Sequence, residues 1–506
     1  MSEVVRYATT APPRPHQPQA RPRLRLQRRH LAAIVTAVLL LCFLVWCGHL
    51  AFGPAQELSG MAVLTLAVFG SAIWLWIFTS IDDTYVALGA AVLLVMMGTL
   101  PTDKLFSSLG EDTVWLLLAA FVISAGVTSS GLATRGAVFI VTGVSSVRVL
   151  FHLLTTVLVA TAFAVPATSG RAALTVPVFV ALANVLREQR RIVVALALTF
   201  PSVILLSAVG SYLGAGAHLI TSQILQASDY PGFSFAGWLV YGIPLALVSS
   251  HLCTELILWL FTSRADRRHR LSINVDDVQA FSEVPLSGPL TVAQSRAALL
   301  ISAVVALWCT EPLHGLHPAV VALLGALLMA SPRYGSVQIG KALKGVPWSL
   351  LLFMAATLTL GTALVGSGAA QWLAVKLLAP VARLGAWAGV GFVIMVVILS
   401  TAAHLVIQSR SARSAVLIPL VVSLAPQVGV DPVGIAFAST AAAGFCHTLT
   451  SSAKPVTLFS GIEGVDTYTP KDLLRLSAFL APTMVVLILL FSFIIWPLMG
   501  MPVLAK

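Results

Sequence analysis

Apolar stretches long enough to cross a lipid bilayer occupy most of this 506-residue chain. A helix of about twenty apolar residues spans the hydrocarbon core of a bilayer. Only 10% of the residues are charged, against roughly 25% in soluble domains, so a large soluble enzyme is excluded. We therefore predict an all-α polytopic membrane protein with about eleven transmembrane helices. The stretches that indicate them are 31–52, 60–80, 84–100, 114–144, 192–227, 232–262, 294–310, 318–332, 346–378, 430–460 and 474–498.

Two further apolar stretches, 150–187 and 386–425, are interrupted at their centres by serine, glycine and arginine. A continuous lipid-facing helix tolerates such an interruption poorly, because lipid offers no partner to polar groups. A helical hairpin that enters and leaves on the same side tolerates it well, since its tip lines a protein cavity. We predict one re-entrant hairpin in each stretch.

Positive charge indicates how the chain is oriented. Residues 1–30 hold seven arginines and one acid, a composition typical of disorder. A nucleic-acid arm or an organelle transit peptide are alternatives, but the apolar run that follows directly favours a cytoplasmic topology signal. With both hairpins re-entrant, most other basic segments, including the polar linker 263–293, fall on the same face. We expect a multi-pass plasma-membrane protein whose N-terminus and linker are cytoplasmic.

The two halves of the chain, 31–262 and 294–506, resemble one another. Chance alignment of alanine- and leucine-rich helices is the simpler explanation, but it does not account for matching intramembrane arginines. Each half holds an odd number of crossings, so the second half is predicted to lie inverted. Inverted repeats with broken helices are typical of secondary transporters, which bind their substrate where the repeats meet. The matching landmarks are 86–94 with 321–329, Trp115 with Trp348, Ser130 with Ser367, and Arg171 with Arg413.

Four basic residues, Arg171, Arg410, Arg413 and Lys454, lie inside these apolar stretches. At the bilayer centre each one costs roughly 2.5–3.5 kcal/mol, and few acids lie nearby to offset this cost. A cationic cavity with too few counter-ions is what an anion site requires, and the planar guanidinium suits carboxylate or sulfate. A single arginine can instead snorkel to the interface or bond a carbonyl. Two arginines at matching positions favour the anion site.

The stretches 192–227 and 430–460 each contain a segment where a helix is expected to break. The first segment is glycine-rich, Gly210–His218, and the second is rich in hydroxyls, Thr448–Pro455. Unwinding at these places frees carbonyls and helix ends to face a solute. Close helix packing through small residues is the alternative for the first segment.

This order of elements resembles the divalent-anion/sodium symporters, the dicarboxylate, citrate and sulfate permeases of the ion transporter superfamily. The resemblance covers about residues 30–500 and rests on a helix triplet, a long helix ending in Ser-Gly, a polar hairpin tip before a proline, and a broken helix, all repeated. The family's Ser-Asn-Thr tips correspond to 167–169 and 409–411, and its asparagine-containing loops to 215–218 and 451–454. The resemblance implies a homodimeric, elevator-type carrier whose tips and broken helices form the substrate and sodium sites.

The chain departs from this family at four asparagine positions, which here hold Thr168, Arg410, His218 and Lys454. A fixed positive charge repels a second cation, so we predict that Arg410 and Lys454 replace bound sodium as counter-charge for the anion. Degenerate sodium sites are then expected near Ser169 and Ser411. The carrier would be sodium-independent, coupled to protons or working as an exchanger.

We therefore predict a secondary active transporter of a small anion, such as a dicarboxylate, citrate or sulfate. An enzyme is not expected, since no nucleophile–base pair or metal-ligand set is apparent, and the lack of a Walker motif argues against ATP-driven transport. The nearest alternative is an arsenite carrier or cation/proton antiporter, but no acid lies in either hairpin or broken-helix motif. No cofactor and no nucleic-acid partner are expected; sodium or a proton is the possible coupling ion, and His218 or His404 could relay the proton.

The predicted substrate-binding residues come from the hairpin tips and the broken helices. They are Thr168, Ser169, Gly170, Arg171, Ser409, Arg410, Ser411, Arg413, Thr450, Ser451, Ser452, Lys454, Gly214 and His218.

Overall fold

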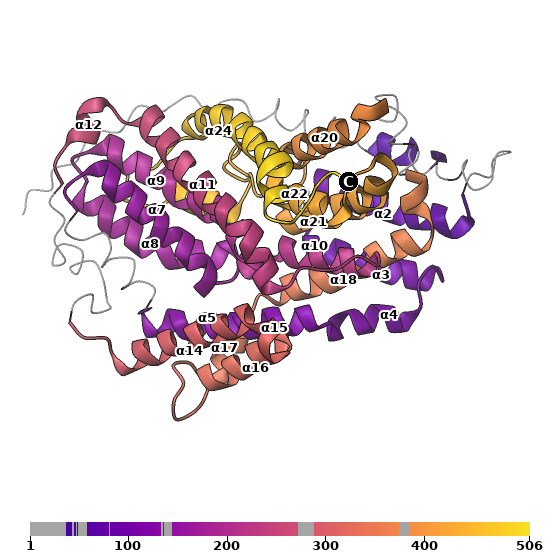
Figure 1. Cartoon of the computed structure of the whole chain (residues 1–506), viewed down its shortest axis with the longest axis horizontal. Coiled ribbons are helices and arrows are strands. Elements are labelled where there is room, and N and C mark those ends of the chain that lie inside the picture. The colour runs from indigo at the N-terminus through magenta and orange to yellow at the C-terminus, as the bar shows by residue number, and fades with distance from the viewer. Residues whose placement is uncertain are drawn as a thin grey trace, which may run out of the picture.

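The computed structural model is built of helices, and the part of the chain that it describes contains no sheet (Figure 1). Eleven helices among the described residues are long and apolar enough to cross a membrane, which confirms the prediction of an all-helical, multi-pass protein. The basic segment 1–30 lies outside the described residues, as do most of 31–52 and most of the linker 263–293. The structure describes residues 37–42, 45, 46, 48, 58–79, 81–132, 135, 144–271, 288–373, 376 and 385–505.

These eleven helices differ in part from the stretches marked in the sequence. The arms of both hairpins are among them, at 147–164, 168–185, 385–405 and 410–428. Three of the marked stretches instead contain shorter apolar helices, of which Pro318–Met329 is one. A twelve-residue helix is about 18 Å long, less than the ~30 Å hydrocarbon core. Such a helix crosses the membrane only together with the segments that flank it.

One set of helices, here named the flanking group, runs along the lower edge and the right-hand side of Figure 1. Helix α18 packs along α3, and α16 packs along α5, so each pair joins the two halves of the chain. Hydrogen bonds also join the two halves: Thr84 Oγ1 of α3 donates to the Ser349 carbonyl of α18 at 3.0 Å, and Ser129 Oγ of α5 donates to the carbonyl of Ser336, which follows α16, at 2.8 Å. The flanking helices are α2 (Gly60–Phe78), α3 (Asp83–Met96), α4 (Thr102–Ser107), α5 (Asp112–Ser130), α14 (Val292–Cys309), α15 (Glu311–His314), α16 (Pro318–Met329), α17 (Ile339–Lys344) and α18 (Trp348–Gly366).

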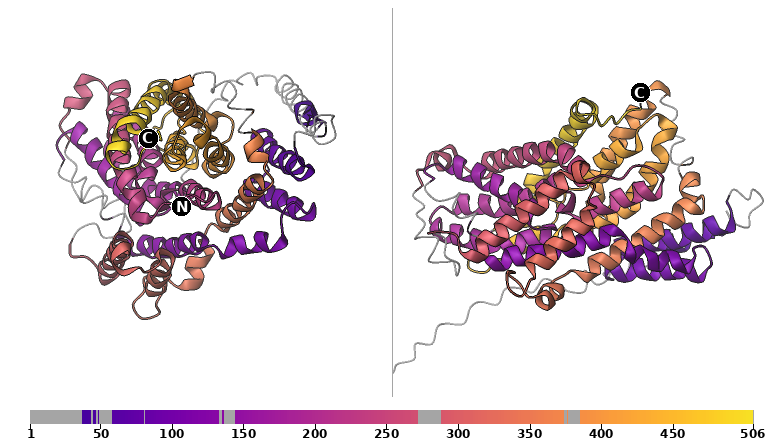
Figure 2. Two further views of the ribbon diagram at one scale, coloured as in Figure 1. Left: turned by 45° about the vertical axis from the view of Figure 1, so that its right-hand side comes forward. Right: turned by 60° about the horizontal axis from the view of Figure 1, so that its bottom comes forward.

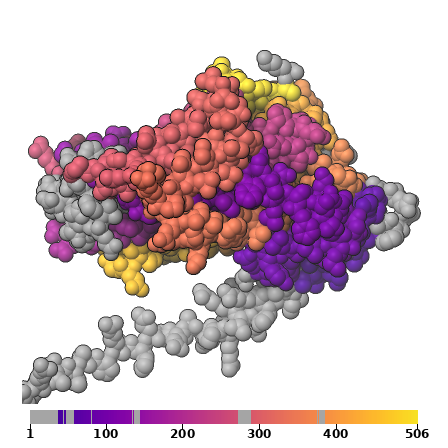
Figure 3. Space-filling model, turned by 90° about the horizontal axis from the view of Figure 1, so that it is seen from below, coloured from indigo at the N-terminus to yellow at the C-terminus, as the bar shows by residue number. Residues whose placement is uncertain are grey.

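The flanking group forms one continuous face of the molecule. Figure 3 shows the indigo helices of the first half beside the orange helices of the second half on this face. Several of its large apolar side chains are exposed, among them Leu299, Leu313 and Leu327. Exposed leucines at this density are expected where a surface faces lipid.

The remaining helices, here named the hairpin group, lie above the lower helices of the flanking group and beside α2 and α3 (Figure 1 and the left view of Figure 2). Helices α7 and α8 form the first hairpin, and α20 and α21 the second; α9 with α10, and α22 with α23, are the broken helices. Each hairpin contacts the broken helix of the other half, because α10 packs on α21 and α23 packs on α8. The helices are α7 (Val147–Ala164), α8 (Thr168–Val185), α9 (Arg190–Leu206), α10 (Gly216–Ala227), α11 (Phe235–Phe261), α12 (Arg264–Arg268), α20 (Ala388–Ala402), α21 (Arg410–Leu424), α22 (Pro432–Ala442), α23 (Lys454–Ser460), α24 (Pro470–Leu490) and α25 (Trp496–Leu498).

Buried aromatic rings hold the broken helices in place. Phe459 of α23 lies between Phe179 of α8 and Phe200 of α9, with ring centroids 5.4 to 5.5 Å apart, and all three side chains are fully buried. On α22, Phe437 packs against Trp238 of α11 at 4.6 Å. Such pairs contribute about 0.5–1.5 kcal/mol each beyond the area they bury. The Phe459 contacts hold α23, which begins at Lys454, against α8 and α9.

Candidate functional site

The tips of the two hairpins place the first turns of α8 and α21 at one point in the molecule. In the first hairpin, Ala167 has φ +68°, which turns the backbone directly before α8 begins at Thr168. In the second hairpin, the Ser409 side chain caps α21 by accepting the Ala412 N–H at 3.3 Å. Both helices therefore start at a hairpin tip, with their N-terminal ends directed into the space beside it.

The two broken helices are interrupted in the same manner. Short 3-10 turns at 207–214 separate α9 from α10, and a non-helical segment, 443–453, separates α22 from α23. The residues that precede α10 and α23, Ala215 and Ala453, have nearly the same extended conformation (φ −156°, ψ 148° and φ −157°, ψ 144°). Among the described residues, no side chain caps α10 or α23, so the first N–H groups of both helices remain for other partners.

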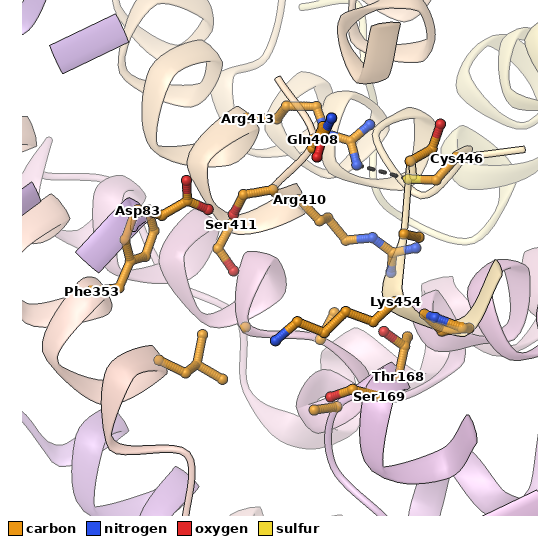
Figure 4. Close-up of a pocket in the computed structure, with 18 of the residues that line it drawn as sticks. Asp83, Thr168, Ser169, Phe353, Gln408, Arg410, Ser411, Arg413, Cys446 and Lys454 are labelled. Atoms are coloured by element: carbon orange, nitrogen blue, oxygen red, sulfur yellow. Dashed lines mark hydrogen bonds between the residues drawn. The ribbon is translucent and has the colours of Figure 1, made fainter. Parts of the chain in front are cut away.

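A cavity of about 370 Å³ lies where α8, α10, α21 and α23 all begin (Figure 4). Its volume falls within the roughly 300–1,000 Å³ that small-molecule sites occupy. Each helix N-terminus carries about half a positive charge, and three of these four have no side-chain cap. Four N-termini directed at one space attract an anion. The rest of the wall comes from the first residues of α3 and α18, which belong to the flanking group.

Nine of the fourteen predicted substrate-binding residues line this cavity. They come from both hairpin tips and from the break before α23: Thr168, Ser169, Ser409, Arg410, Ser411, Arg413, Ser451, Ser452 and Lys454.

Three of these nine residues carry a positive charge. Arg410 Nη2 donates to the Leu205 carbonyl at 3.3 Å and to the Gly444 carbonyl at 2.9 Å, so one guanidinium joins the breaks of both halves. Arg413 is fully buried and donates from Nη2 to Cys446 Sγ at 2.8 Å; its Nε has no hydrogen-bond partner in the described structure. Lys454 extends into the cavity (Figure 4).

Arg171 lies outside the cavity, and we exclude it from the proposed site. Its guanidinium is fully buried and donates to Thr161 Oγ1 and the Ile204 carbonyl, both at 3.0 Å, to Ser207 Oγ at 2.7 Å, and also to the Leu158 carbonyl. These acceptors leave little donor capacity for an anion. Arg171 and Arg413 thus have equivalent places in the repeat, each joining a hairpin arm to a helix break, but Arg413 alone faces the cavity.

Four other predicted residues, Gly170, Thr450, Gly214 and His218, also lie outside the cavity lining. Gly214 serves packing, because a Cβ there would lie 2.1 Å from the Ala208 carbonyl oxygen. This distance supports the alternative of close packing at that residue.

The two histidines considered as proton relays are both buried hydrogen-bonding groups. His218 Nδ1 lies 3.0 Å from the Ser211 carbonyl, and its ring stacks on Trp238 at 4.7 Å. His404 Nε2 lies 2.8 Å from Thr448 Oγ1, which bonds Ser477 Oγ at 2.7 Å. Neither histidine lines the cavity.

Several cavity residues were not predicted from the sequence, and two of them are acids. Asp82 caps α3, accepting the N–H groups of Thr84 at 2.9 Å and Tyr85 at 3.2 Å, and Asp83 follows it. The pair of adjacent acids directly before an apolar helix could have marked them as candidate site residues. Only packing, however, places these acids beside a cavity whose other residues lie more than 300 positions later in the chain. The other unpredicted lining residues that carry polar or aromatic groups are Thr84, Ser349, Phe353, Gln408 and Cys446.

Sequence comparison identifies related proteins. A sequence model of the citrate transporter family (CitMHS) matches residues 72–442 and 305–505 of this chain. A membrane protein of Cupriavidus necator is 24% identical over 74% of this chain and 76% of its own length. The sodium-dependent dicarboxylate transporter SdcS of Staphylococcus saprophyticus is 22% identical over 81% of this chain and 82% of its own length.

Two solved transporter structures share the fold. The YdaH transporter of Alcanivorax borkumensis superposes with a TM-score of 0.55 and 14% identity, over 88% of this chain and 99% of that one. The antimetabolite efflux pump MtrF of Neisseria gonorrhoeae gives the same TM-score and identity, over 89% of this chain and 98% of that one. At this level of identity the likeness concerns the fold alone.

Proposed function

Because the chain belongs to the citrate transporter family, we propose that it carries a small anion, such as a dicarboxylate, citrate or sulfate, by secondary active transport through the cavity described above. As a member of this family it is a multi-pass membrane transporter and not an enzyme. The observation that best supports an anion is the meeting of four helix N-termini with Arg410, Arg413 and Lys454 around one cavity. Two acids, Asp82 and Asp83, oppose these three cations, so the cavity keeps one net positive charge.

We further propose that transport is independent of sodium. In secondary transporters, carbonyls at unwound helices coordinate sodium. Here Arg410 donates to such a carbonyl at each break, Leu205 and Gly444, and supplies a fixed positive charge between them. The staphylococcal relatives are named sodium-dependent, so the proposal implies that this chain differs from them in its coupling ion. Any sodium sites near Ser169 and Ser411 would be degenerate, and a proton or an exchanged anion would take over the coupling.

The cavity lies between the two groups of helices, which favours an elevator-type mechanism. The hairpin group supplies both tips and both breaks, and the flanking group supplies the wall formed by α3 and α18. We propose that the hairpin group moves the bound anion past a flanking group that forms the homodimer interface. We also propose a plasma-membrane location, with the N-terminus and the linker 263–293 in the cytoplasm.

The test is uptake of radiolabelled succinate, citrate and sulfate into proteoliposomes, with either sodium or choline outside, for wild type and Arg410→Ala. Saturable uptake in choline that is lost in Arg410→Ala is the expected result. Uptake that collapses when choline replaces sodium would overturn sodium independence and leave the anion carrier standing. Lack of saturable uptake of all three anions would refute this substrate class.

An arsenite carrier or cation/proton antiporter is the second candidate, because Asp82 and Asp83 line the cavity. Proton-driven uptake of a cation into everted vesicles, lost in Asp83→Asn, would support that alternative against the anion carrier.

A further inference from the structure

Two histidines face each other near one end of the hairpin group. Nδ1 of His152 on α7 lies 2.8 Å from Nδ1 of His251 on α11, and the two rings stack with their centroids 5.0 Å apart. Nε2 of His152 lies 2.5 Å from Oε1 of Glu255, and the same oxygen accepts the Arg148 Nε–H at 2.7 Å. These four side chains, here named the histidine cluster, join the first arm of the first hairpin to α11.

The histidine cluster lies where α7 and α11 approach the linker 263–293. Helix α12, which directly follows α11, packs against α7 at the left-hand end of Figure 1. Just beyond α12, the Leu271 N–H donates to the carbonyl of Ser145, which precedes α7, at 3.0 Å. This is the face proposed to be cytoplasmic. The side chains of His152 and Glu255 are 29% and 35% exposed, so protons from that face reach them.

The contact between the two Nδ1 atoms limits how many protons the pair holds. A hydrogen bond between two imidazole nitrogens needs one hydrogen, donated by one ring and accepted by the other. Nε2 of His152 carries a second hydrogen, because its partner, the Glu255 carboxylate, is an acceptor. One further proton fits on Nε2 of His251 without the loss of any of these bonds. Still another proton would put hydrogens on both Nδ1 atoms and break the contact, so the pair binds one proton and is opened by a second.

The charges around the pair do not offset that second proton. Glu255 is the charged group that contacts the pair, and Arg148 balances it, so two protons would leave two like charges side by side. Among the described residues, the other titratable groups on the elements packed against α7 and α11 form no hydrogen bond or ion pair with either histidine. They are Arg171, Arg190, Arg191, Tyr212, Tyr241, Cys253, Arg264, Asp266, Arg267, Arg268, Arg296, Cys309, Lys471, Asp472 and Arg475.

The two helices that the histidine cluster joins also hold the first hairpin tip and the first break. Near its other end, α7 accepts a hydrogen bond from Arg171, which also bonds the turn that follows α9. Helix α11 packs on that turn, where Trp238 Nε1 donates to the Val209 carbonyl at 2.8 Å. Opening of the histidine cluster therefore loosens the frame around the first tip, which supplies Thr168 and Ser169 to the cavity.

We propose that the histidine cluster is a proton-binding site that regulates the carrier from its proposed cytoplasmic face: with at most one bound proton the pair holds α7 to α11, and a second proton separates the rings and loosens the first hairpin. This inference rests on the proposed anion transport and adds a regulation from outside the cavity. Histidine changes its charge between about pH 5 and pH 8, so acidification within this range acts on the pair. A loosened tip binds the anion more weakly, because a binding site depends on groups that are already held in place.

The experiment compares wild type with His251→Gln and with the matched control His317→Gln. His251→Gln leaves one histidine in the cluster, so two charged rings no longer meet. His317 is also partly exposed and also pairs with an acid, Asp112 at 3.0 Å, but it caps α16 of the flanking group. Counterflow of citrate and of succinate in proteoliposomes is measured with equal pH on both sides, at about pH 7.5 and about pH 5.5. Protonation of the substrate is the same for every variant, so the ratio of the two KM values is compared between proteins.

In wild type the KM is expected to rise on acidification about fivefold more than in His251→Gln, the size that repulsion between two adjacent charges at a partly exposed site supports. His317→Gln is expected to keep the wild-type ratio. Equal ratios in wild type and His251→Gln would overturn the inference, because His251 would then have a structural role alone. So would an equal loss of the ratio in His317→Gln. His152→Gln, for which the same ratio is expected, replaces His251→Gln if the latter does not fold.

Thermal unfolding in detergent at the same two pH values tests the proton site without transport. The unfolding midpoint of wild type should fall more on acidification than that of His251→Gln, because the folded pair excludes a second proton that two unfolded histidines accept. Equal falls would overturn the proton site even where transport is normal. Wild-type protein without saturable counterflow at either pH would instead overturn the proposed function, and the unfolding result would still decide whether the pair binds protons as proposed.

Discussion

Substituting lysine for arginine at the two equivalent positions, 171 and 413, should separate stability from transport. Both arginines are fully buried and both reach the break of the broken helix in their own half. Lysine keeps the positive charge but loses the planar fork with its five donors. We expect Arg171→Lys to destabilise the protein without changing the KM, and Arg413→Lys to raise the KM with a smaller loss of stability.

The magnitudes follow from the hydrogen bonds of each side chain. The Arg171 guanidinium donates to four acceptors on α7, α9 and the turn after α9. A hydrogen bond to a charged group contributes about 1.5 kcal/mol at the low end of its range, so losing two of these bonds costs about 3 kcal/mol of unfolding free energy. Arg413 has a bond to Cys446 Sγ at 2.8 Å, a long one to the Phe445 carbonyl at 3.4 Å, and an unpaired Nε. We expect its replacement to cost about 1 kcal/mol.

The assay combines two readouts on the same purified variants. Thermal unfolding in detergent, followed by the fraction that stays monodisperse after heating, reports stability; counterflow in proteoliposomes reports the KM. Arg413→Lys is expected to raise the KM about fivefold to tenfold, because lysine lacks the guanidinium Nε–H that we propose Arg413 offers to the anion. The reasoning is refuted if Arg171→Lys raises the KM as much as Arg413→Lys, or if Arg171→Lys is as stable as wild type.

Three further changes test other parts of the structure. Arg410→Asn removes the fixed positive charge and frees the Leu205 and Gly444 carbonyls to coordinate sodium. We therefore expect anion uptake in choline to fall at least tenfold and uptake in sodium to be partly retained, which flux assays in the two salts measure. Gly214→Ala should destabilise the protein by about 1–3 kcal/mol, because the added Cβ would lie 2.1 Å from the Ala208 carbonyl oxygen. Thermal unfolding measures this loss, and Gly366→Ala is the control, since a Cβ at Gly366 meets no atom within 4 Å. Phe459→Ala removes the buried ring through which α23 packs against α8 and α9, so a loss of about 3–5 kcal/mol of unfolding free energy and a higher KM are expected, and normal values of both would contradict this.

Much of the fold could be predicted because insertion into a membrane restricts which residues each segment of the chain can contain. A lipid-spanning helix must be long and apolar, and a hairpin tip or a break must be polar, so both kinds of segment are visible without any partner. The prediction was least complete for helix length: α3 and α16 are shorter than a bilayer core, since length within a packed group depends on neighbouring helices. The site could be predicted as far as its hairpin tips and the break before α23, because these carry basic and hydroxyl groups that lipid does not tolerate.

The sequence by itself determined which segments are apolar, where they are interrupted, and that matching arginines occur in the two halves. Tertiary structure alone decided which of those arginines meets the cavity. Arg171 and Arg413 have the same local context, six residues before a proline, yet acceptors from α7 and α9 surround one while the other lines the site. It also decided that Asp83 and Lys454 line the same cavity. The physical reason is that the partners of a buried polar group come from distant segments, and packing alone selects them.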